Sequence, residues 1–594
     1  MTTITTQTAT KGGGVPPSTK SNRPKRRATS PSAALLARGE PMVWLAGGGM
    51  AVCVTMIVFL LGFVAVQGFR TFWPVEIVKV STVAGQTVMG EVTRASAYRP
   101  ESFFIDSMPE EAAAQARRMI EANGGWADRR LFRSGNFELT NEHFTWVSDF
   151  EIVTGSESRP QWALIFERQA WGRFYGEPVA FLVDGEVVAQ EPSEVWARFQ
   201  EFHGPIRDRW AERVRLEKED TGTVNHKIEH ARLALRNVEL KDGKDSEAYK
   251  SELTKFQQVE STQQKEFARI RDDISKLNQE NARYQILVKT SSGQDVPLPL
   301  SDVVRAYPAN QLGFTDKLGI YMGRWREFLL DDPREANSEG GVFPAIFGTV
   351  VMTVLMSLAV VPFGVAAALY LREYAKAGPM ISAVRIAINN LAGVPSIVFG
   401  VFGLGFFAYL MGSSIDQLLF TAKLPSPTFG TGGLLWASLT LSLLTLPVVI
   451  VATEEALAAV PNSMREGSYA CGASKWQSIR RIVLPRAMPG IMTGAILAMA
   501  RGAGEVAPLM LVGAVKLAPE LPVDGYFPFV HLERSFMHLG FHIYDLGFQS
   551  QNSEAAKPMV YTTTLLLIVI IAGLNFAAIS LRSRLRRKFL SSAF

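Results

Sequence analysis

Six long apolar runs most constrain what this chain of 594 residues can fold into. A helix that crosses a bilayer needs about 20 mostly apolar residues, and each run reaches that length. The runs cover approximately Met42–Phe69, Val342–Leu371, Ile386–Met411, Leu434–Ala459, Met488–Val515 and Met559–Leu581. Four prolines lie inside them, namely Pro362, Pro395, Pro447 and Pro508. Because such prolines are tolerated where neighbouring helices satisfy the freed carbonyls, the sequence predicts an all-α membrane core of six packed transmembrane helices.

The first run, residues 42–69, is expected to stay in the protein as an anchor. A signal peptide is the alternative, but about 40 residues precede this run and it is longer than the core of a signal peptide. Residues 1–40 are rich in Thr, Ser, Gly, Pro and basic residues, which predicts a disordered tail. Residues 582–594 form a second basic tail.

The basic residues between the runs predict the orientation of the chain. Lys and Arg gather before the first run, after the second, between the fourth and fifth, and after the sixth, whereas the other short connections hold few. Such residues accumulate in cytoplasmic segments. Both termini are therefore expected in the cytoplasm, and residues 70–341 are expected outside.

Composition excludes several other classes of protein. The only cysteines, Cys53 and Cys471, lie far apart, so neither a disulfide scaffold nor a cysteine metal site is expected. A net charge of +5 does not indicate a nucleic-acid partner, because membrane proteins collect basic residues on their cytoplasmic side. The sequence contains no phosphate-binding GxxxxGK[ST] motif and no credible nucleophile–base set. We expect a chain that is not an enzyme and holds no metal or cofactor.

The insert at residues 70–341 makes up nearly half of the chain. Its strand-rich part, at about 140–190, contains the β-branched and aromatic runs Trp162–Phe166 and Pro178–Val183. Asp184-Gly185 follows the second run and is typical of a tight hairpin turn. These signals, together with the helical stretch that follows them, predict a large α+β domain outside the membrane.

Residues 208–286 of the insert predict an antiparallel coiled-coil hairpin. Mostly apolar residues, with some polar breaks, recur at alternating steps of four and three from Trp210 to Val238 and again from Tyr249 to Tyr284, with a polar, glycine-containing turn at 241–245. Each arm of about 30 residues would reach about 45 Å. The hairpin is either a spacer or a docking arm. His226 and His230 are one turn apart, but they lack further ligands, so solvated helix surface is expected rather than a metal site.

The segment at 461–486, between the fourth and fifth runs, carries the most specific motif. It predicts a helix, a break at Gly472, a short amphipathic helix and a stop at Pro485 before the membrane. Met464, Tyr469, Trp476 and Ile479 give these helices an apolar surface that suits docking. An ordinary interfacial loop is the alternative.

This segment resembles the EAA loop of ABC-importer permeases of type I. The residues that match the spacing of that family are Glu466, Gly472, Ala473, Ile482, Leu484 and Pro485, although the alanines usual after the glutamate are Gly467 and Ser468 here. The resemblance implies a permease domain over residues 342–581. It also implies that the loop inserts into a groove of a partner ATPase and transmits its stroke.

Two further segments are similar to phosphate-specific permease subunits. One is Gly393-Val-Pro395-Ser-Ile-Val-Phe-Gly400-Val-Phe-Gly403, and the other is Arg501-Gly502-Ala-Gly504-Glu505-Val-Ala-Pro508-Leu509. The Ala-Pro-Leu ending favours the PstA type over its PstC-like partner. The glycines and prolines of both segments are expected to serve close helix packing or gating. The resemblance does not extend to the insert, which is much longer than the corresponding loop of the family.

Arg501 and Glu505 are the candidates for the substrate path. A charge near the centre of a spanning helix costs about 2.5–3.5 kcal/mol on insertion scales, and residues four apart share one helix face. The fork of donors on Arg501 suits phosphate oxygens, while Glu505 would position it. A purely structural ion pair is the alternative.

The resemblance implies several partners in a bacterial inner membrane. They are a PstC-type second permease subunit forming a heterodimer, a PstB-type ATPase dimer at the EAA loop, a periplasmic phosphate-binding protein and, as a further candidate, a regulatory PhoU-like protein. A permease for another oxyanion, such as sulfate or molybdate, is the nearest rival. A membrane sensor that uses the outside coiled coil is a rival from another class.

Overall fold

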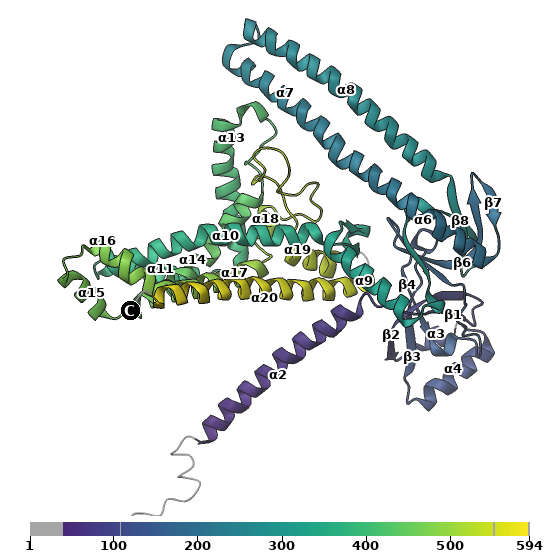
Figure 1. Ribbon diagram of the computed structural model, residues 1–594. Coiled ribbons are helices and arrows are strands. Elements are labelled where there is room, and N and C mark those ends of the chain that lie inside the picture. The colour runs from purple at the N-terminus through teal and green to yellow at the C-terminus, as the bar shows by residue number, and fades with distance from the viewer. Residues whose placement is uncertain (1–39, 107, 551–552, 592–594) are drawn as a thin grey trace, which may run out of the picture. The chain divides into compact units, whose positions relative to one another are not determined.

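The computed structural model describes residues 40–106, 108–550 and 553–591 (Figure 1). The chain separates into two units, Met1–Phe63 and Val64–Phe594. The predicted tail at 1–40 lies outside the described residues except for Glu40, where the first described helix begins. In the first unit, the described part of this helix exposes its apolar side chains along its whole length from Met42 to Phe63.

Six helices in the described part of the chain are long and apolar enough to cross a membrane, as predicted. They are Met42–Arg70 within α2 (Glu40–Arg70), Phe343–Tyr374, which begins with α10 (Phe343–Leu369), Ser396–Leu419, which joins α12 (Ser396–Phe402) to α13 (Ser413–Leu419), α14 (Leu434–Ala458), Lys475–Gly504, which joins α16 (Lys475–Ser478) to α17 (Leu484–Gly504), and Ser553–Arg584 within α20 (Ser553–Ser591). The prediction of a six-helix membrane core is confirmed.

The third span is shorter at its start than the predicted Ile386–Met411. A separate helix, α11 (Pro379–Leu391), precedes it, residues 392–395 are not helical, and Pro395, whose ψ is 136°, caps the start of α12. Proline disfavours helical backbone at the preceding residue and suits a helix start. Pro395 therefore begins α12 instead of lying inside a span, and the predicted continuous helix is wrong at this point.

The fifth span ends earlier than the predicted Val515. Helix α17 stops at Gly504, Glu505 is extended with ψ 134°, and a short helix, α18 (Leu509–Val512), starts after Pro508. Pro508 thus follows the same rule as Pro395. The prolines at 362 and 447 do lie inside α10 and α14, as predicted.

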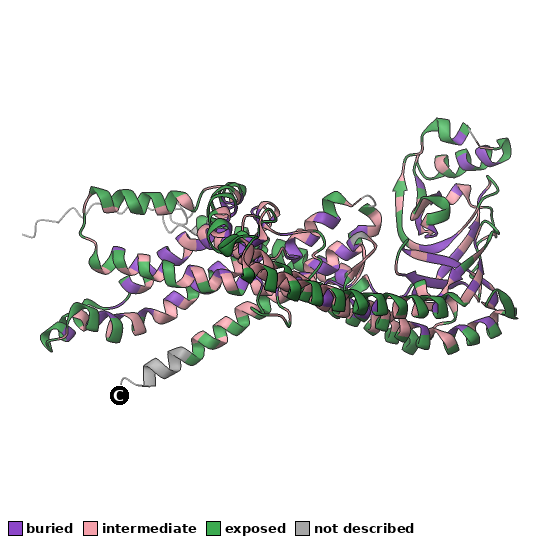
Figure 2. Cartoon of the chain, turned by 90° about the horizontal axis from the view of Figure 1, so that it is seen from above, coloured by how far each residue is buried: buried purple, intermediate pink, exposed green. Residues whose placement is uncertain are grey.

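The centre of the membrane core is α14, which packs against α10 and α17. Figure 2 shows buried residues both among the packed helices and in the sheets of the insert. In α14, 67% of the most apolar window is buried, compared with 6% in α20. The buried hydroxyl of Ser442 on α14 donates to the carbonyl of its own helix at Ser438 and lies 3.0 Å from the carbonyl oxygen of Met356 on α10. In the second unit, the end of α2 packs on α20, where the Thr562 hydroxyl lies 3.2 Å from the Gly68 carbonyl oxygen.

The insert between the first two spans contains two antiparallel sheets. The first has the order β1-β2-β3-β4, and the second has the order β10-β5-β6-β8-β9 with β7 also paired to β6. The strands are β1 (Ile77–Ser81), β2 (Thr87–Tyr98), β3 (Ala127–Arg133), β4 (Phe144–Ser148), β5 (Leu164–Arg168), β6 (Arg173–Val183), β7 (Glu186–Ala189), β8 (Tyr284–Lys289), β9 (Asp295–Pro299) and β10 (Val303–Pro308). The α+β class is confirmed, but strands extend well beyond the predicted 140–190 on both sides.

Smaller elements complete the chain between the sheets and the spans. They are α3 (Ser102–Asp106), α4 (Glu110–Ala122), α5 (Phe137–Thr140), α9 (Phe314–Leu330), β11 (Pro333–Arg334), β12 (Glu339–Gly340), α15 (Asn462–Ala470) and α19 (Leu539–Tyr544). The predicted turn between β6 and β7 is present. Asp184 and Gly185 have φ angles of 55° and 84°, the left-handed pair that a two-residue hairpin requires.

A long helical hairpin leaves the second sheet (Figure 1). One arm runs through α6 (Pro192–Arg215), a π-helical turn at Leu216–Asp220 and α7 (Thr221–Asp242), and the other arm is α8 (Glu247–Ala282). The chain reverses at Gly243, whose φ of 79° suits glycine. The buried Val224 and Ile270 of the predicted seam pack together across the arms.

Both arms of the hairpin meet at its root, and one arm contacts the loops of the membrane core. At the root, Arg209 Nε donates to Asn281 Oδ1 at 2.7 Å. Further along, the Thr223 hydroxyl lies 2.6 Å from the Tyr526 hydroxyl, and the His226 ring stacks on Tyr526 with centroids 4.3 Å apart. His226 and His230 are exposed, as expected of helix surface, and the His226 ring in addition contacts the loop between the fifth and sixth spans.

Candidate functional site

The motif between the fourth and fifth spans folds into two short helices joined by a tight turn. Helix α15 ends at Ala470, and Gly472 then takes a φ of 80°, where its N–H donates to the Tyr469 carbonyl at 2.9 Å. Ser474 begins α16 with a capping box, in which Ser474 and Gln477 each satisfy the other's backbone N–H. The predicted helix–glycine–helix arrangement is thus present.

The structure does not end the second helix at Pro485. A π-helical turn at Ile479–Val483 links α16 directly to α17, and Pro485 lies in the first turn of α17. Proline is accepted in a first turn because its missing N–H has no required partner there, and a π-helical turn changes the hydrogen-bond pattern before it. The predicted stop is therefore wrong, and one helix runs from Lys475 to Gly504.

The two short helices expose part of the predicted apolar surface. Tyr469 and Trp476 are 44% and 55% exposed. Ile479 is buried, and Met464 packs into the cluster formed by the end of α14 and the start of α17. Only the two aromatic side chains are therefore available to a partner, and the other two fix the motif to the membrane core.

The residues that match the motif spacing differ in exposure. Glu466 and Gly472 are exposed, while Ala473, Ile482, Leu484 and Pro485 are half-buried. The exposed glutamate and the aromatic pair lie on the same two helices, α15 and α16. The turn and these side chains together form an exposed polar and aromatic end of the membrane core.

Two contacts that hold the motif gave no signal in the sequence. The buried hydroxyls of Ser468 and Ser478 lie 2.6 Å apart and join α15 to α16. Arg465 forms an ion pair of 3.0 Å with Glu373, and it donates to the Leu457 carbonyl at 2.8 Å. Isolated serines and a lone arginine have no distinctive spacing, so only the folded chain reveals these pairings.

Arg501 and Glu505 form the predicted pair in a different setting. Arg501 lies in the last turn of α17 instead of near the centre of a span, and Glu505 is the extended residue that follows the helix. Arg501 Nε is 3.5 Å from Glu505 Oε1, and the two side chains are 38% and 23% exposed. The pair is therefore held by the end of the helix, where a cation also complements the helix dipole, and not by a shared helix face.

Three of the predicted small residues permit close approach between helices. A Cβ added at Gly400 would lie 2.7 Å from Pro508 Cα, one at Gly403 would lie 2.1 Å from Thr440 Oγ1, and one at Gly502 would lie 2.3 Å from Met356 Sδ. Gly504 differs, because an added Cβ there meets no atom of the described chain within 4 Å. Gly393 has only an ordinary contact, at 3.4 Å from the Asn390 carbonyl oxygen.

The comparisons with known proteins concern this part of the chain. The family described as binding-protein-dependent transport system inner membrane component matches residues 361–590. The phosphate transport system permease protein PstA 1 of Mycobacterium tuberculosis is 35% identical over 244 residues, which are 41% of this chain and 71% of that protein. The chain belongs to the PstA-type family of ABC-transporter permeases.

Another relative is also named as an ABC-transporter permease. The probable ABC transporter permease protein YqgH of Bacillus subtilis is 36% identical over 195 residues, 32% of this chain and 59% of that protein, so the match spans less than two thirds of its length. Among solved structures, the MetNI methionine ABC transporter in an inward-facing form is 20% identical, with 41% of this chain and 94% of that chain covered and a TM-score of 0.31.

Membership of this permease family makes the chain a multi-pass transport subunit of the inner membrane. The family match begins at residue 361, after the insert. Within the matched region, one helix of 30 residues carries the motif turn at its start and Arg501 in its last turn. A helix of this length spans about 45 Å.

Proposed function

We propose that this chain is the permease subunit of an ABC importer that moves inorganic phosphate into the cytoplasm. The single observation that carries this proposal is the 35% identity to a phosphate transport permease across the matched spans. Arg501 supports it, because the guanidinium is partly exposed at the end of α17 and carries donors suited to an oxyanion. A second permease subunit of PstC type would complete the path around this residue.

The orientation proposed for the chain follows the basic residues. Arg465 and Arg480 flank the motif turn, and α20 carries a basic end. With these segments in the cytoplasm, both termini are cytoplasmic and the insert is periplasmic. A periplasmic phosphate-binding protein would then deliver the anion on the side where the hairpin contacts the Tyr526 loop.

Coupling to ATP hydrolysis would pass through α15 and α16. The exposed Tyr469 and Trp476 supply an aromatic anchor for a groove on a dimeric ATPase of PstB type. Gly472 permits the sharp turn between the two helices, and Glu466 adds an exposed charge. Because the helix that starts at Lys475 reaches Arg501 without a break, a push on the turn would move the anion path.

The arrangement suits alternating access. Close contacts at Gly400 and Gly403 leave little room for lateral movement of the third span, Ser396–Leu419, against Pro508 and α14, so rigid displacement is favoured over local bending. Arg501 would hold the anion during transit, and Glu505 would keep the guanidinium in place while limiting how tightly the anion binds. The chain itself contributes binding and movement, and the partner ATPase contributes the energy.

Uptake measurements test this proposal. The gene for this chain is deleted, and uptake of radiolabelled phosphate is measured under phosphate limitation with and without the parental chain supplied on a plasmid. Sulfate and molybdate are offered as competitors in hundredfold excess. We expect phosphate uptake to depend on the chain and to resist both competitors. Phosphate uptake that persists without the chain, or that excess sulfate or molybdate abolishes, would overturn the assignment of the substrate.

A further inference from the structure

A cavity of about 660 Å³ lies where the insert meets the ends of the first and sixth spans. Its walls come from the end of α2, from β2 and β3, from the segment around β12 and from the start of α20. None of the residues of the motif turn or the Arg501 pair lines it. The cavity is thus separate from the sites to which the transport function is assigned.

The lining of the cavity carries an excess of positive charge. Seven basic side chains line it against five acidic ones. The basic residues are Arg70, Arg94, Arg133, Arg173, Arg324, Arg334 and Lys557, and the acidic residues are Glu91, Glu167, Glu327, Glu339 and Glu554. Since charges held in a partly enclosed space interact more strongly than in water, this excess of two favours an anion.

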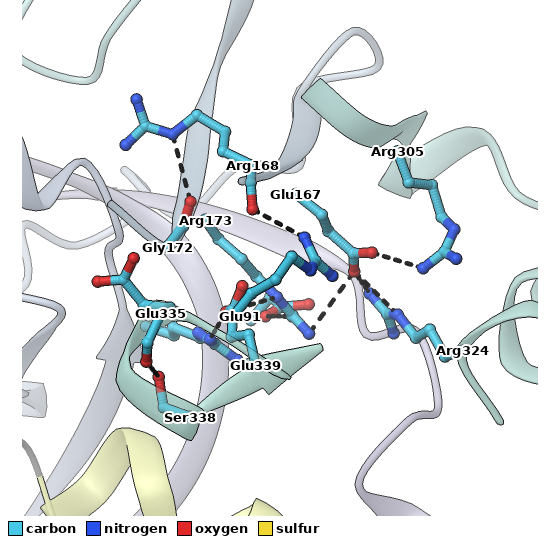
Figure 3. Close-up of polar contacts among 12 residues, drawn as sticks. Glu91, Glu167, Arg168, Gly172, Arg173, Arg305, Arg324, Glu335, Ser338 and Glu339 are labelled. Carbon is cyan, nitrogen blue, oxygen red and sulfur yellow. Dashed lines mark hydrogen bonds and ion pairs between the residues drawn. The ribbon is translucent and has the colours of Figure 1, made fainter. Parts of the chain in front are cut away.

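The buried acids on the floor of the cavity are already neutralised (Figure 3). Glu167 accepts from Arg324 Nε at 2.9 Å and from Arg305 Nη1 at 2.6 Å, and Glu91 accepts from Arg173 Nη1 at 2.7 Å. Burial would raise the pKa of Glu167, but the guanidinium groups of Arg324, Arg305 and Arg173 outweigh it and hold that pKa well below its usual value. The acids therefore remain ionised and bound to arginine, so they do not offer sites to a cation.

Several donors at the cavity are left over after these pairings. Arg173 Nε is buried without a hydrogen-bond partner in the described chain, and Glu339 Oε1 is 3.8 Å from it, too far for a hydrogen bond. Arg133 uses one nitrogen, Nη2, for its 2.6 Å bond to Glu339. Arg70 is exposed at the rim, and among the described residues its guanidinium has no hydrogen bond or ion pair, since only its backbone carbonyl accepts, from the Trp73 N–H at 3.1 Å. These donors come from three different elements.

We propose that this cavity binds a phosphate group. Guanidinium forks match the spacing of phosphate oxygens and bind them in pairs, and the unused donors of Arg70, Arg133 and Arg173 supply such forks. The volume is in the range of about 300–1,000 Å³ that holds whole small molecules, and Phe72, Trp73 and Met559 add an apolar wall. The group is therefore carried either by free phosphate with its water or by the headgroup of an anionic phospholipid, because the cavity adjoins the ends of two spans.

Binding measurements with two ligands test the proposal on the full-length chain. In one arm, the protein is held in phosphatidylcholine nanodiscs and equilibrium binding of radiolabelled inorganic phosphate is measured. In the other arm, the nanodiscs contain increasing fractions of phosphatidylglycerol, and the molecules retained by the protein are counted by native mass spectrometry. The Arg501→Gln variant is measured in parallel. Because binding at the cavity does not depend on transport, it should persist in that variant even if the proposed function is wrong.

The variants are Arg70→Gln alone and Arg70→Gln combined with Arg133→Gln. The matched control is Arg159→Gln, which removes an exposed arginine of the insert that pairs with Glu76 outside the cavity. We expect saturable binding of one ligand by the parent and by the control, a loss of affinity of about threefold in the single variant and a loss of tenfold or more in the double variant. The arm that responds identifies the source of the phosphate group.

Two results would overturn the proposal. The first is that the parent binds neither inorganic phosphate nor phosphatidylglycerol saturably. The second is that the Arg70→Gln variant binds both as tightly as the parent while its melting temperature is unchanged. Arg70 is exposed and not part of the buried network, so this variant is expected to fold and the test does not depend on the double variant.

Discussion

Removing both charges of the pair at the end of α17 separates a transit site from a structural ion pair. The perturbation is Arg501→Gln combined with Glu505→Gln. The pair spans 3.5 Å and both side chains are partly exposed, so its stabilising contribution is that of a surface pair, about 0.2–1 kcal/mol. Losing that amount would change the folding equilibrium by at most about fivefold. Two neutral amides could also pair in place of the charges.

A direct contact with the anion predicts a much larger effect. A hydrogen bond to a charged group contributes about 1.5–3 kcal/mol, which corresponds to about 10- to 150-fold in transport rate. The double variant should therefore stay inactive, and Arg501→Lys, which keeps the charge but loses the fork, should transport at an intermediate rate. Glu505→Gln alone is the matched control, because it leaves the guanidinium in place.

The assay is phosphate uptake at limiting concentration by a strain that lacks the chromosomal copy, divided by the amount of chain in the membrane. Recovery of the double variant to within about fivefold of the parental rate, the range expected for a surface pair, would refute the transit role and leave a structural pair. A drop in the amount of chain in the membrane would be visible in the normalisation and would not be mistaken for loss of transport.

Three further perturbations test the coupling turn, the helix packing and the hairpin contact. Gly472→Ala forces a non-glycine residue to a φ of 80°, which should cost about 1–2 kcal/mol of stability and reduce transport, whereas Gly467→Ala, in a helix with open space around it, should not reduce transport. A Gly472→Ala variant that co-purifies with the ATPase and transports at the normal rate would contradict the coupling role. Gly403→Ala should lower the melting temperature, because its Cβ would meet the stiff side chain of Thr440 at an overpacking cost of about 1–3 kcal/mol, whereas Gly405→Ala should leave the melting temperature unchanged. Equal melting temperatures of the two variants would contradict this packing. Tyr526→Phe removes the hydroxyl that contacts α7 and should raise the rate of amide hydrogen exchange in the middle of the hairpin, while transport is partly retained. An unchanged exchange rate would mean that this contact does not stabilise the arm.

Length and local chemistry made much of the fold predictable from the sequence. Spans reveal themselves because each one needs about 20 apolar residues in a row. The turn at Asp184-Gly185 was predictable because few residues accept two successive left-handed conformations. The reversal at Gly243 followed from a break in heptad spacing. In each of these places, neighbouring residues alone determine the conformation.

Interruptions and non-local pairings were not predictable in this way. The strands from Ile77 to Arg133 and from Tyr284 to Pro308 have weak alternation, and their pairing joins segments more than 100 residues apart along the second sheet. At Pro485 the rule that proline ends a helix failed, because a π-helical turn absorbed the missing bond. The three arginines around Glu167 come from three elements, β6, β10 and α9, so their meeting is visible only in the folded chain.

The charged pair shows the same limit at the candidate site. Arg501 and Glu505 were identified by charge in an apolar run, which is a rare and therefore informative signal. Their spacing suggested a shared helix face, but the helix ends between them. The ion pair still forms because Glu505, the extended residue directly after the helix, can direct its side chain back toward the last turn.

The hydrogen bond between Arg209 and Asn281 joins the two arms where the hairpin leaves and re-enters the insert. A hairpin that starts and ends at one point can change in length without moving either sheet, as surface insertions generally can. Adding or removing one heptad in both arms would keep the apolar seam facing inward and would shift the tip by about 10 Å. The contact at Tyr526 lies on the root side of such a change, so it would be preserved. The distance by which the hairpin extends beyond the membrane loops is thus set by the number of heptads in its arms and can change without altering the rest of the fold.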